Sequence, residues 1–231
     1  MNNPDSLEKL NDEIIHCRKC PRLVEWRERV AEEKKRVFMG WDYWGKPVPG
    51  FGDINGRIMV IGLAPGAHGS NRTGRMFTGD ASGDFLFPAL FRAGFANQPD
   101  SRSIGDGLTI NDLFITAACR CAPPENKPTR VEIDNCRGFL MRESALMVNL
   151  RGIVALGRIG FEEALILLHH QYDYEINPKP RFSHSAVFFS EENPSPWLIS
   201  SYHPSRQNTQ TGRLTIAMFN EIWTKAKSLL R

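Results

Sequence analysis

The sequence predicts an α/β fold in which a mostly parallel sheet is covered by helices on both faces. Two observations support this prediction. Apolar runs of strand length alternate along the chain with longer segments of helical periodicity. Glycine, proline, histidine and arginine gather in the loops that follow the apolar runs. Because ligands of such sheets bind beyond the carboxyl ends of the strands, we expect the chemistry in those loops.

The chain begins with two expected helices, at residues 6–17 and 21–38, which are joined by Cys17-Arg-Lys-Cys20. The second helix carries the charged stretch WRERVAEEKKR, which is typical of a solvated face. Residues 41–52 are rich in glycine, proline and aromatic side chains, and they predict a loop.

Strands and helices then alternate to the end of the chain. The strands are expected at residues 57–63, 113–118, 152–156, 186–189 and 197–202, and the helices at residues 81–95, 129–148, 159–170 and 213–230. A capping box marks the start of one helix, because Thr129 is followed three positions later by Glu132. No repeat or long linker divides the sequence, so residues 1–231 are expected to form a single domain.

Composition argues against secreted and membrane proteins. The hydrophobic fraction of 41% and the charged fraction of 24% are ordinary for a globular chain. The first stretch, MNNPDSLEKLNDEII, is unlike a secretory signal, and no apolar run approaches the length of a membrane span. We therefore expect a cytoplasmic protein, in which five cysteines indicate a metal site or catalysis rather than disulfides.

Four of the cysteines predict a metal site. Cys17 and Cys20 form a C-x-x-C pair between two helices. Cys121 follows a strand, and Cys136 lies on the inward face of its helix. Zinc and an iron–sulfur cluster are both bound by four thiolates, and the spacing does not choose between them. Cys121 and Cys136 also fit as small buried side chains without a metal, but the C-x-x-C pair is hard to explain in that way. Cys119 is expected in the core.

The segment GLAPGAHGSNRTGRMFTGD, residues 62–80, follows the first strand and contains five glycines. It matches neither the Walker nor the dinucleotide-binding pattern, because it lacks a lysine and Gly62 is followed by Leu63 and Ala64. Its small residues leave space and Phe77 offers a stacking plane, which fits a pocket for a flat heterocycle. A structural turn with Phe77 in the core fits the composition equally well.

Residues 62–80 and the segment HPSRQNTQTGR, which begins at His203, resemble the paired motifs of the uracil-DNA glycosylase superfamily. The segments CRKC, CAPPENKPT and DNC carry the four cysteines that its thermophile-type branches use for a [4Fe-4S] cluster. The sequence most resembles the broad-specificity branch called type B or family five, from Cys17 to the final helix. The resemblance implies a three-layer αβα sandwich with a central four-stranded parallel sheet, and the removal of deaminated bases from DNA.

We expect the chemistry on two residues. As the N-glycosidic bond breaks, the sugar gains oxocarbenium character and the base becomes an anion, so a carboxylate and a donor are needed. Asp80 is the candidate carboxylate and Asp84 the alternative, while an aspartate before a helix also fits an N-cap. His203 matches the family histidine that donates to the leaving base.

Two departures from the superfamily pattern concern substrate range. Many members have a water-activating polar residue where this sequence has Leu63 and Ala64, and a uracil-reading asparagine where it has Ala117. Both departures fit type B, so hypoxanthine, xanthine and modified uracils are expected substrates beside uracil.

A DNA-binding surface is expected around the pocket, and the protein is expected to act as a monomer on double-stranded and single-stranded DNA. The implied substrate-binding residues are Gly62, Ala64, Pro65, Gly66, His68, Phe77, Ala117, Ser205, Arg206 and Gln207. Phe77 is expected to stack on the extruded base, and residues 205–207 to enter the minor groove. The expected phosphate-binding cations are Arg72, Arg75, Arg206 and Arg213.

Two other classes of protein fit the cysteines alone. One is a cytosolic redox protein in which an iron–sulfur cluster is the function, and the other is a non-catalytic nucleic-acid-binding protein with a structural zinc. Asp80 and His203 lie in two separate loops at the ligand-binding edge of the predicted sheet. This arrangement favours the enzyme.

Overall fold

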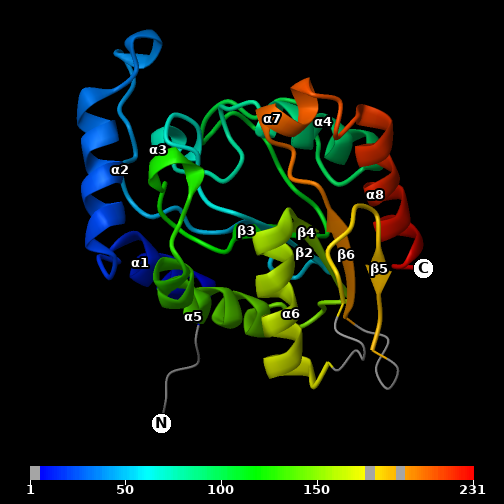
Figure 1. Ribbon diagram of the computed structural model, residues 1–231. Helices are drawn as coiled ribbons and strands as arrows, with labels where there is room; N and C mark the ends of the chain where they lie inside the picture. Colours follow the sequence, from blue (N-terminus) through cyan, green and yellow to red (C-terminus); the bar gives the residue numbers. More distant parts are fainter. Residues whose placement is uncertain (1–5, 175–179, 191–195) are drawn as a thin grey trace.

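The computed structural model describes residues 6–174, 180–190 and 196–231, and a six-stranded sheet lies at its centre (Figure 1). The strands are β1 (Phe51–Gly52), β2 (Ile58–Gly62), β3 (Leu113–Ala117), β4 (Gly152–Leu156), β5 (Val187–Phe188) and β6 (Trp197–Ser201). Their order is β1-β3-β2-β4-β6-β5; the four inner strands are parallel, and each outer strand pairs antiparallel with its neighbour. The predicted α/β fold with a mostly parallel central sheet is confirmed.

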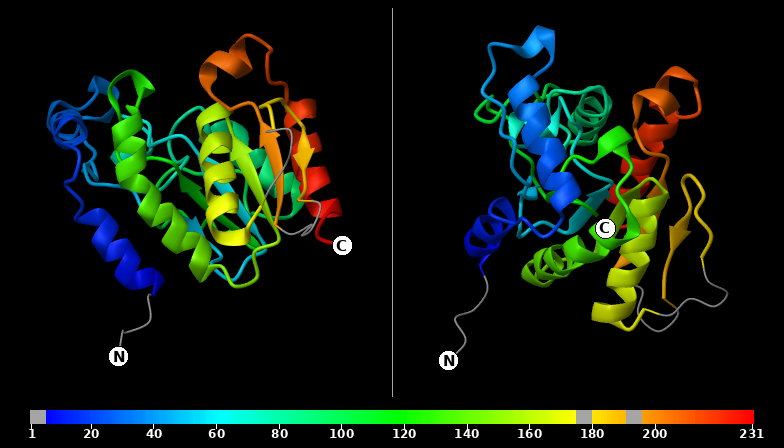
Figure 2. Two further views of the ribbon diagram at one scale, coloured as in Figure 1. Left: turned by 60° about the horizontal axis from the view of Figure 1, so that its bottom comes forward. Right: turned by 60° about the vertical axis from the view of Figure 1, so that its left-hand side comes forward.

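Helices cover both faces of this sheet (Figure 2). The α-helices are α1 (Leu7–Ile15), α2 (Pro21–Glu33), α3 (Ser70–Thr73), α4 (Gly83–Ala93), α5 (Arg130–Leu146), α6 (Arg158–Tyr172), α7 (Arg206–Gln210) and α8 (Ile216–Ser228). Two short 3-10 helices are η1 (Arg36–Phe38) and η2 (Pro124–Asn126). The capping box is confirmed: the Glu132 backbone N–H donates to Thr129 Oγ1, and the Thr129 N–H donates to Glu132 Oε2.

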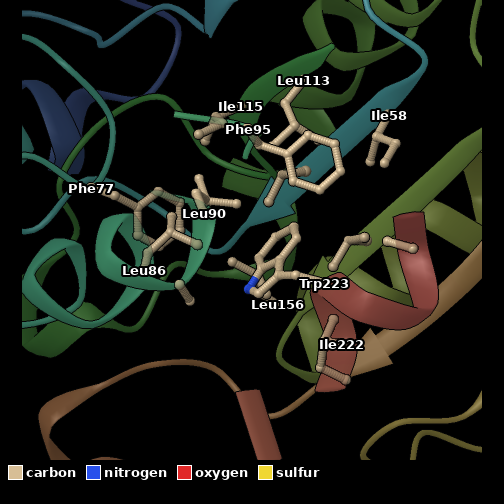
Figure 3. Close-up of a cluster of buried hydrophobic side chains, with 14 of the residues drawn as sticks. Ile58, Phe77, Leu86, Leu90, Phe95, Leu113, Ile115, Leu156, Ile222 and Trp223 are labelled. Carbon is tan, nitrogen blue, oxygen red and sulfur yellow. The ribbon is translucent and has the colours of Figure 1, made fainter. Parts of the chain in front are cut away.

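The parallel strands are mostly apolar because successive side chains enter opposite layers of core. Ile58 and Val60 of β2 pack with α4 and α8, where Trp223 occupies the centre of the cluster (Figure 3). Met59 and Ile61 of the same strand pack on the other side, against α5 and α6. All five residues of each parallel strand are buried. The loops at the carboxyl ends of these strands are therefore held by a rigid platform.

Three element predictions were wrong in ways that bear on the site. The helix predicted over residues 21–38 ends at Glu33, because the chain turns at Lys34, whose φ is 52°. Residues 41–52 contain strand β1, whose two residues extend the sheet beside β3. The loop after β6 contains the short helix α7, which Ser205 caps by accepting from the N–H of Asn208.

No helix in the three described ranges combines the length and the apolar character needed to cross a bilayer.

Candidate active site

The glycines of residues 62–80 make room for side chains from the end of the same segment. A Cβ on Gly69 would overlap the carboxylate of Asp80, and one on Gly66 would lie 2.9 Å from Asp80 Oδ2. A Cβ on Gly62 would lie 2.7 Å from Cζ of Phe77. The segment is therefore the wall of a pocket, folded closely around an aspartate and an aromatic ring.

Asp80 uses only one of its two carboxylate oxygens for structure. Its Oδ1 accepts from the backbone N–H of Ser82 at 3.0 Å and of Gly83 at 3.1 Å, at the start of α4. Its Oδ2 makes no hydrogen bond to any residue within the described ranges. Burial raises the pKa of Asp80, while the two backbone hydrogen bonds oppose that shift. One oxygen of Asp80 thus caps the helix, while the other has no hydrogen-bond partner among the described residues.

His203 lies immediately after β6, facing the glycine-rich segment. Its ring stacks on that of Phe77, with centroids 5.9 Å apart and planes 27° from parallel. The side-chain amide of Asn208 holds the loop by donating to the His203 carbonyl oxygen at 2.8 Å. Burial lowers the pKa of His203 to about 4. The imidazole is therefore neutral near pH 7 and donates from one ring nitrogen only.

Asp80 and His203 line one cavity of about 650 Å³ at the carboxyl edge of the sheet. Seven more of the expected site residues line it with them: Ala64, Gly66, His68, Phe77, Ala117, Ser205 and Arg206. The remaining three do not: Gly62 lies under the ring of Phe77, Pro65 is buried, and Gln207 is exposed on α7. Asp84 is exposed on α4 outside the cavity lining, so the geometry favours Asp80 over the alternative.

The two interpretations of Phe77 are both supported by its position. Its backbone has a φ of 53°, which turns the side chain inward between Gly62 and His203. One side of the ring belongs to the core shared with Leu86 and Leu90, and another part lines the cavity. Phe77 therefore supports the imidazole of His203 as well as forming a wall.

The other four expected site residues, the cysteines, line a second and much smaller cavity. The cavity is lined by Cys17, Cys20, Cys121 and Cys136 together with apolar side chains and with Lys19, Arg120 and Asn135. All five cysteines are free, and Cys119 is fully buried beside this cavity without lining it. Among the described residues, no three His, Cys, Asp or Glu side chains are placed as ligands of a single metal ion. The thiols surround a space and do not converge on one point.

Two donors point at the sulfurs of this second cavity. Arg27, which is 2% exposed, donates from Nη1 to Cys121 Sγ at 2.9 Å and to the Cys17 carbonyl oxygen at 3.3 Å. Asn135 donates to Cys20 Sγ at 3.4 Å. Arg27 also pairs with Glu28 at 3.7 Å, and donors directed at a sulfur stabilise its thiolate form. The donor set therefore fits a group that is bound by four thiolates.

The chain was compared with known protein families. The model of the uracil DNA glycosylase superfamily matches residues 49–227. The chain belongs to this superfamily.

The chain is more similar to some branches of the superfamily than to others. A type-5 uracil-DNA glycosylase of Mycobacterium leprae is 49% identical over 225 residues, covering 97% of this chain and 96% of the relative. A type-5 uracil-DNA glycosylase of Thermus thermophilus is 51% identical over 219 residues, covering 94% of each. A type-4 uracil-DNA glycosylase of Pyrobaculum aerophilum is 31% identical over 163 residues, covering 70% of this chain and 66% of the relative. The resemblance inferred from the motifs is confirmed.

One expectation about this superfamily member's surface was wrong. Arg72 and Arg75 were expected to bind phosphates, but both are buried. Arg72 donates to the carbonyl oxygens of His68 and Gly79, at 2.8 and 3.0 Å. Arg75 pairs with Asp106 at 2.7 Å. These two guanidiniums stabilise the segment at residues 62–80 from within and are not available to DNA.

Several cavity-lining residues were missed by sequence reasoning. They include Lys35 and Phe38 from the chain that follows α2, Ser82 from the start of α4, and Asn126 from η2. The sequence offers only a weak signal for them, the cluster of cations and aromatic side chains at residues 34–44. Lys35 and Phe38 lie before residue 49, outside the part that the superfamily model matches.

Proposed function

We propose that the protein excises uracil from DNA by hydrolysing the N-glycosidic bond, and so initiates base excision repair. The observation that carries this proposal is that Asp80 and His203, from two distant segments, line one cavity of about 650 Å³. This volume lies in the usual range for small-molecule pockets. Residues 1–231 act in this proposal as a monomeric, single-domain enzyme.

The reaction begins when the target nucleotide leaves the base stack, which costs roughly a few kcal/mol. The bond between C1′ and the base nitrogen then breaks, and its electron pair moves to the base. Neutral His203 donates a hydrogen bond to the base oxygen on which the negative charge develops. This donor is present over the physiological range because burial keeps the pKa of His203 at about 4.

Asp80 acts at the sugar. Its Oδ2, which has no hydrogen-bond partner among the described residues, accepts a proton from the water that attacks C1′. The negative charge of the carboxylate also stabilises the oxocarbenium-like sugar. The bonds from Ser82 and Gly83 to Oδ1 hold the carboxylate in place during both events.

Apolar residues at three positions of the cavity wall support a broad substrate range. Ala64 and Ala117 line it with methyl groups, and Leu63 lies beside them, so these positions present no side-chain donor that selects one base edge. We propose that hypoxanthine, xanthine and modified uracils are excised as well as uracil.

We propose that Cys17, Cys20, Cys121 and Cys136 hold a [4Fe-4S] cluster. These four cysteines line one cavity, and four cysteine thiolates are the usual ligands of such a cluster. When bound, the cluster would cross-link the segment between α1 and α2, the loop after β3 and α5. Arg27, which donates to Cys121 Sγ and also pairs with Glu28, would offset part of the charge of the thiolates.

The test is incubation of the purified protein with a DNA duplex that carries one uracil, followed by strand cleavage at abasic sites. We expect an abasic site at the uracil and none in the matched thymine duplex; parallel duplexes with hypoxanthine or xanthine test the broader range. Binding to DNA without base release would support a non-catalytic nucleic-acid-binding protein. A brown preparation that neither binds nor cleaves DNA would support a redox protein.

A further inference from the structure

The chain forms a short arm, residues 34–39, between the end of α2 and Trp41. Its sequence is KKRVFM. Lys35 and Phe38 line the same cavity as Asp80 and His203. Figures 1 and 2 place this arm and α7 at the same end of the molecule, beyond the carboxyl ends of the parallel strands. The arm and α7 therefore both border the mouth of the cavity.

The arm is fixed to the glycine-rich segment by a buried cation. The rings of Phe38 and Trp41 lie 3.9 and 4.0 Å from the guanidinium carbon of Arg72. Arg72 in turn bonds to the backbone of the pocket wall. The backbone N–H of Lys35 also donates to the hydroxyl of Tyr43 at 3.4 Å. These contacts set the position of the arm relative to the catalytic groups.

What the arm presents to solvent is unusual for a surface turn. Lys34, Lys35 and Arg36 are consecutive cations, and none of them makes an ion pair with a carboxylate in the described part of the chain. Val37 and Met39 are 70% and 59% exposed. Two large apolar side chains and unpaired cations are thus held in water beside a catalytic cavity.

We propose that residues 34–39 are a second DNA-contacting element, which acts across the cavity mouth from α7. Lys35 and Arg36 bind phosphates of the strand that carries the flipped nucleotide. Val37 and Met39 cover the base stack next to the gap, as apolar wedges do in proteins that open the minor groove. This inference rests on the proposed glycosylase function. In it, Lys35 and Arg36 supply the phosphate contacts that were expected from Arg72 and Arg75, which are buried.

The cations are tested by the salt dependence of binding to a duplex with an abasic site. The variant Lys35→Gln/Arg36→Gln is compared with Arg151→Gln/Arg231→Gln, two exposed arginines outside the cavity lining. Each neutralised phosphate contributes about 0.9 to the slope of log K against log salt. We expect the arm variant to bind more weakly and to lose up to about two units of slope, while the control matches wild type. A wild-type slope in the arm variant overturns the proposal.

The apolar side chains are tested by single-turnover excision of uracil from duplex and from single-stranded DNA. The variant Val37→Ser/Met39→Ser is compared with Val148→Ser, whose side chain is 79% exposed just before β4. We expect excision from the duplex to slow about tenfold or more, because the wedge offsets only part of the free energy that unstacking costs. Excision from the single strand should be unchanged, since it has no base stack to open.

Equal slowing on both substrates would mean that the substitutions disturb the pocket, and it would overturn the proposed wedge role of Val37 and Met39. Unchanged rates on both substrates would also overturn that role. Thermal melts of the variants are expected to match wild type, since the substituted side chains are mostly in water. Failure of the wild-type protein to release uracil would refute the proposed function itself. If the wild-type protein releases uracil and the arm variants bind and react as it does, only the proposed role of the arm is refuted.

Discussion

The two cavities of this protein differ in size, in lining and in the partners of their polar groups. The cavity around Asp80 and His203 is open, measures about 650 Å³, and mixes polar groups with small apolar residues. The cysteine cavity has about 10 Å³ of free space and is lined by the four cysteines, by apolar side chains and by Lys19, Arg120 and Asn135. One keeps an unpaired carboxylate oxygen beside room for a ligand. The other gives a thiol a guanidinium partner from Arg27.

This difference suits the cysteine cavity to holding the fold together and the cavity around Asp80 and His203 to catalysis. The thiols come from the segment between α1 and α2, from the loop after β3 and from α5, so a group that binds them all joins segments that have no strand pairing in common. The proposed catalytic residues, Asp80 and His203, lie in loops beyond the carboxyl ends of strands that are fully buried. Substitutions in the first region are therefore expected to change stability, and substitutions in the second to change rate.

The largest effect is expected from the cysteines. Replacing Cys17, Cys20, Cys121 or Cys136 by Ala is expected to remove the cluster and to cost several kcal/mol, because ligand-binding energy is folding energy in such sites. Iron analysis and thermal melts check this. Cys119→Ala is the matched control: it should keep its iron and lose about 1 kcal/mol for the buried sulfur. Full iron content in any of the four ligand variants contradicts the assignment.

His203→Ala removes the donor to the leaving base. Loss of one such donor typically costs about 10²–10³-fold in rate, so single-turnover excision of uracil should fall by that factor. Iron content should remain at the wild-type level, since His203 does not line the cysteine cavity. A rate near wild type would mean that another group stabilises the departing base.

Crowding the aspartate is expected to have a somewhat smaller effect. A Cβ on Gly69 would overlap the carboxylate of Asp80, and displacement of a reacting group by about 1 Å costs on the order of 10²-fold. Gly66→Ala, whose Cβ would lie 2.9 Å from Oδ2, should slow excision less. Gly40→Ala meets nothing within 4 Å and serves as the control. The reverse order of Gly69→Ala and Gly66→Ala would show that the carboxylate is not held as described.

The smallest effect is expected from pH once Asp80 has lost its proton. Asp80 must be ionised, and burial raises its pKa, so the single-turnover rate should rise with pH as this carboxyl group titrates and then level off. His203, with a pKa of about 4, is neutral near pH 7 and adds no further change there. A pH–rate profile measures this. A fall in rate with increasing pH near neutrality would indicate that protonated His203 is the active form.

The sequence was informative wherever local pattern decides structure. The capping box at Thr129 and the fully buried strands follow from short-range preferences, and both are as predicted. Cys136 faces inward because its position on α5 places it beside Phe139 and Leu140, which are buried with it. Asp80 was recognisable because its place before a helix and at the end of a glycine-rich segment is visible in the sequence alone.

The sequence was uninformative where partners come from far away in the chain. Arg72 in a glycine-rich loop looks exposed, but Phe38 and Trp41 close over it from a segment about thirty residues earlier. Arg75 likewise finds Asp106 across the fold. The arm beside the cavity mouth was missed for the same reason, since the charged stretch of α2 indicates an ordinary solvated helix until its turn at Lys34 is known.

The central claim is that Asp80 serves the reaction and not the stability of the fold. It is tested most directly by the single-turnover rate of Asp80→Asn on a uracil duplex, with Asp84→Asn measured beside it. The amide keeps an oxygen for the N–H groups of Ser82 and Gly83, so iron content and melting temperature should stay at wild type. The account predicts a loss of about 10²-fold or more for Asp80→Asn and a wild-type rate for the exposed Asp84→Asn. A wild-type rate for Asp80→Asn, with or without a collapse of Asp84→Asn, would contradict it.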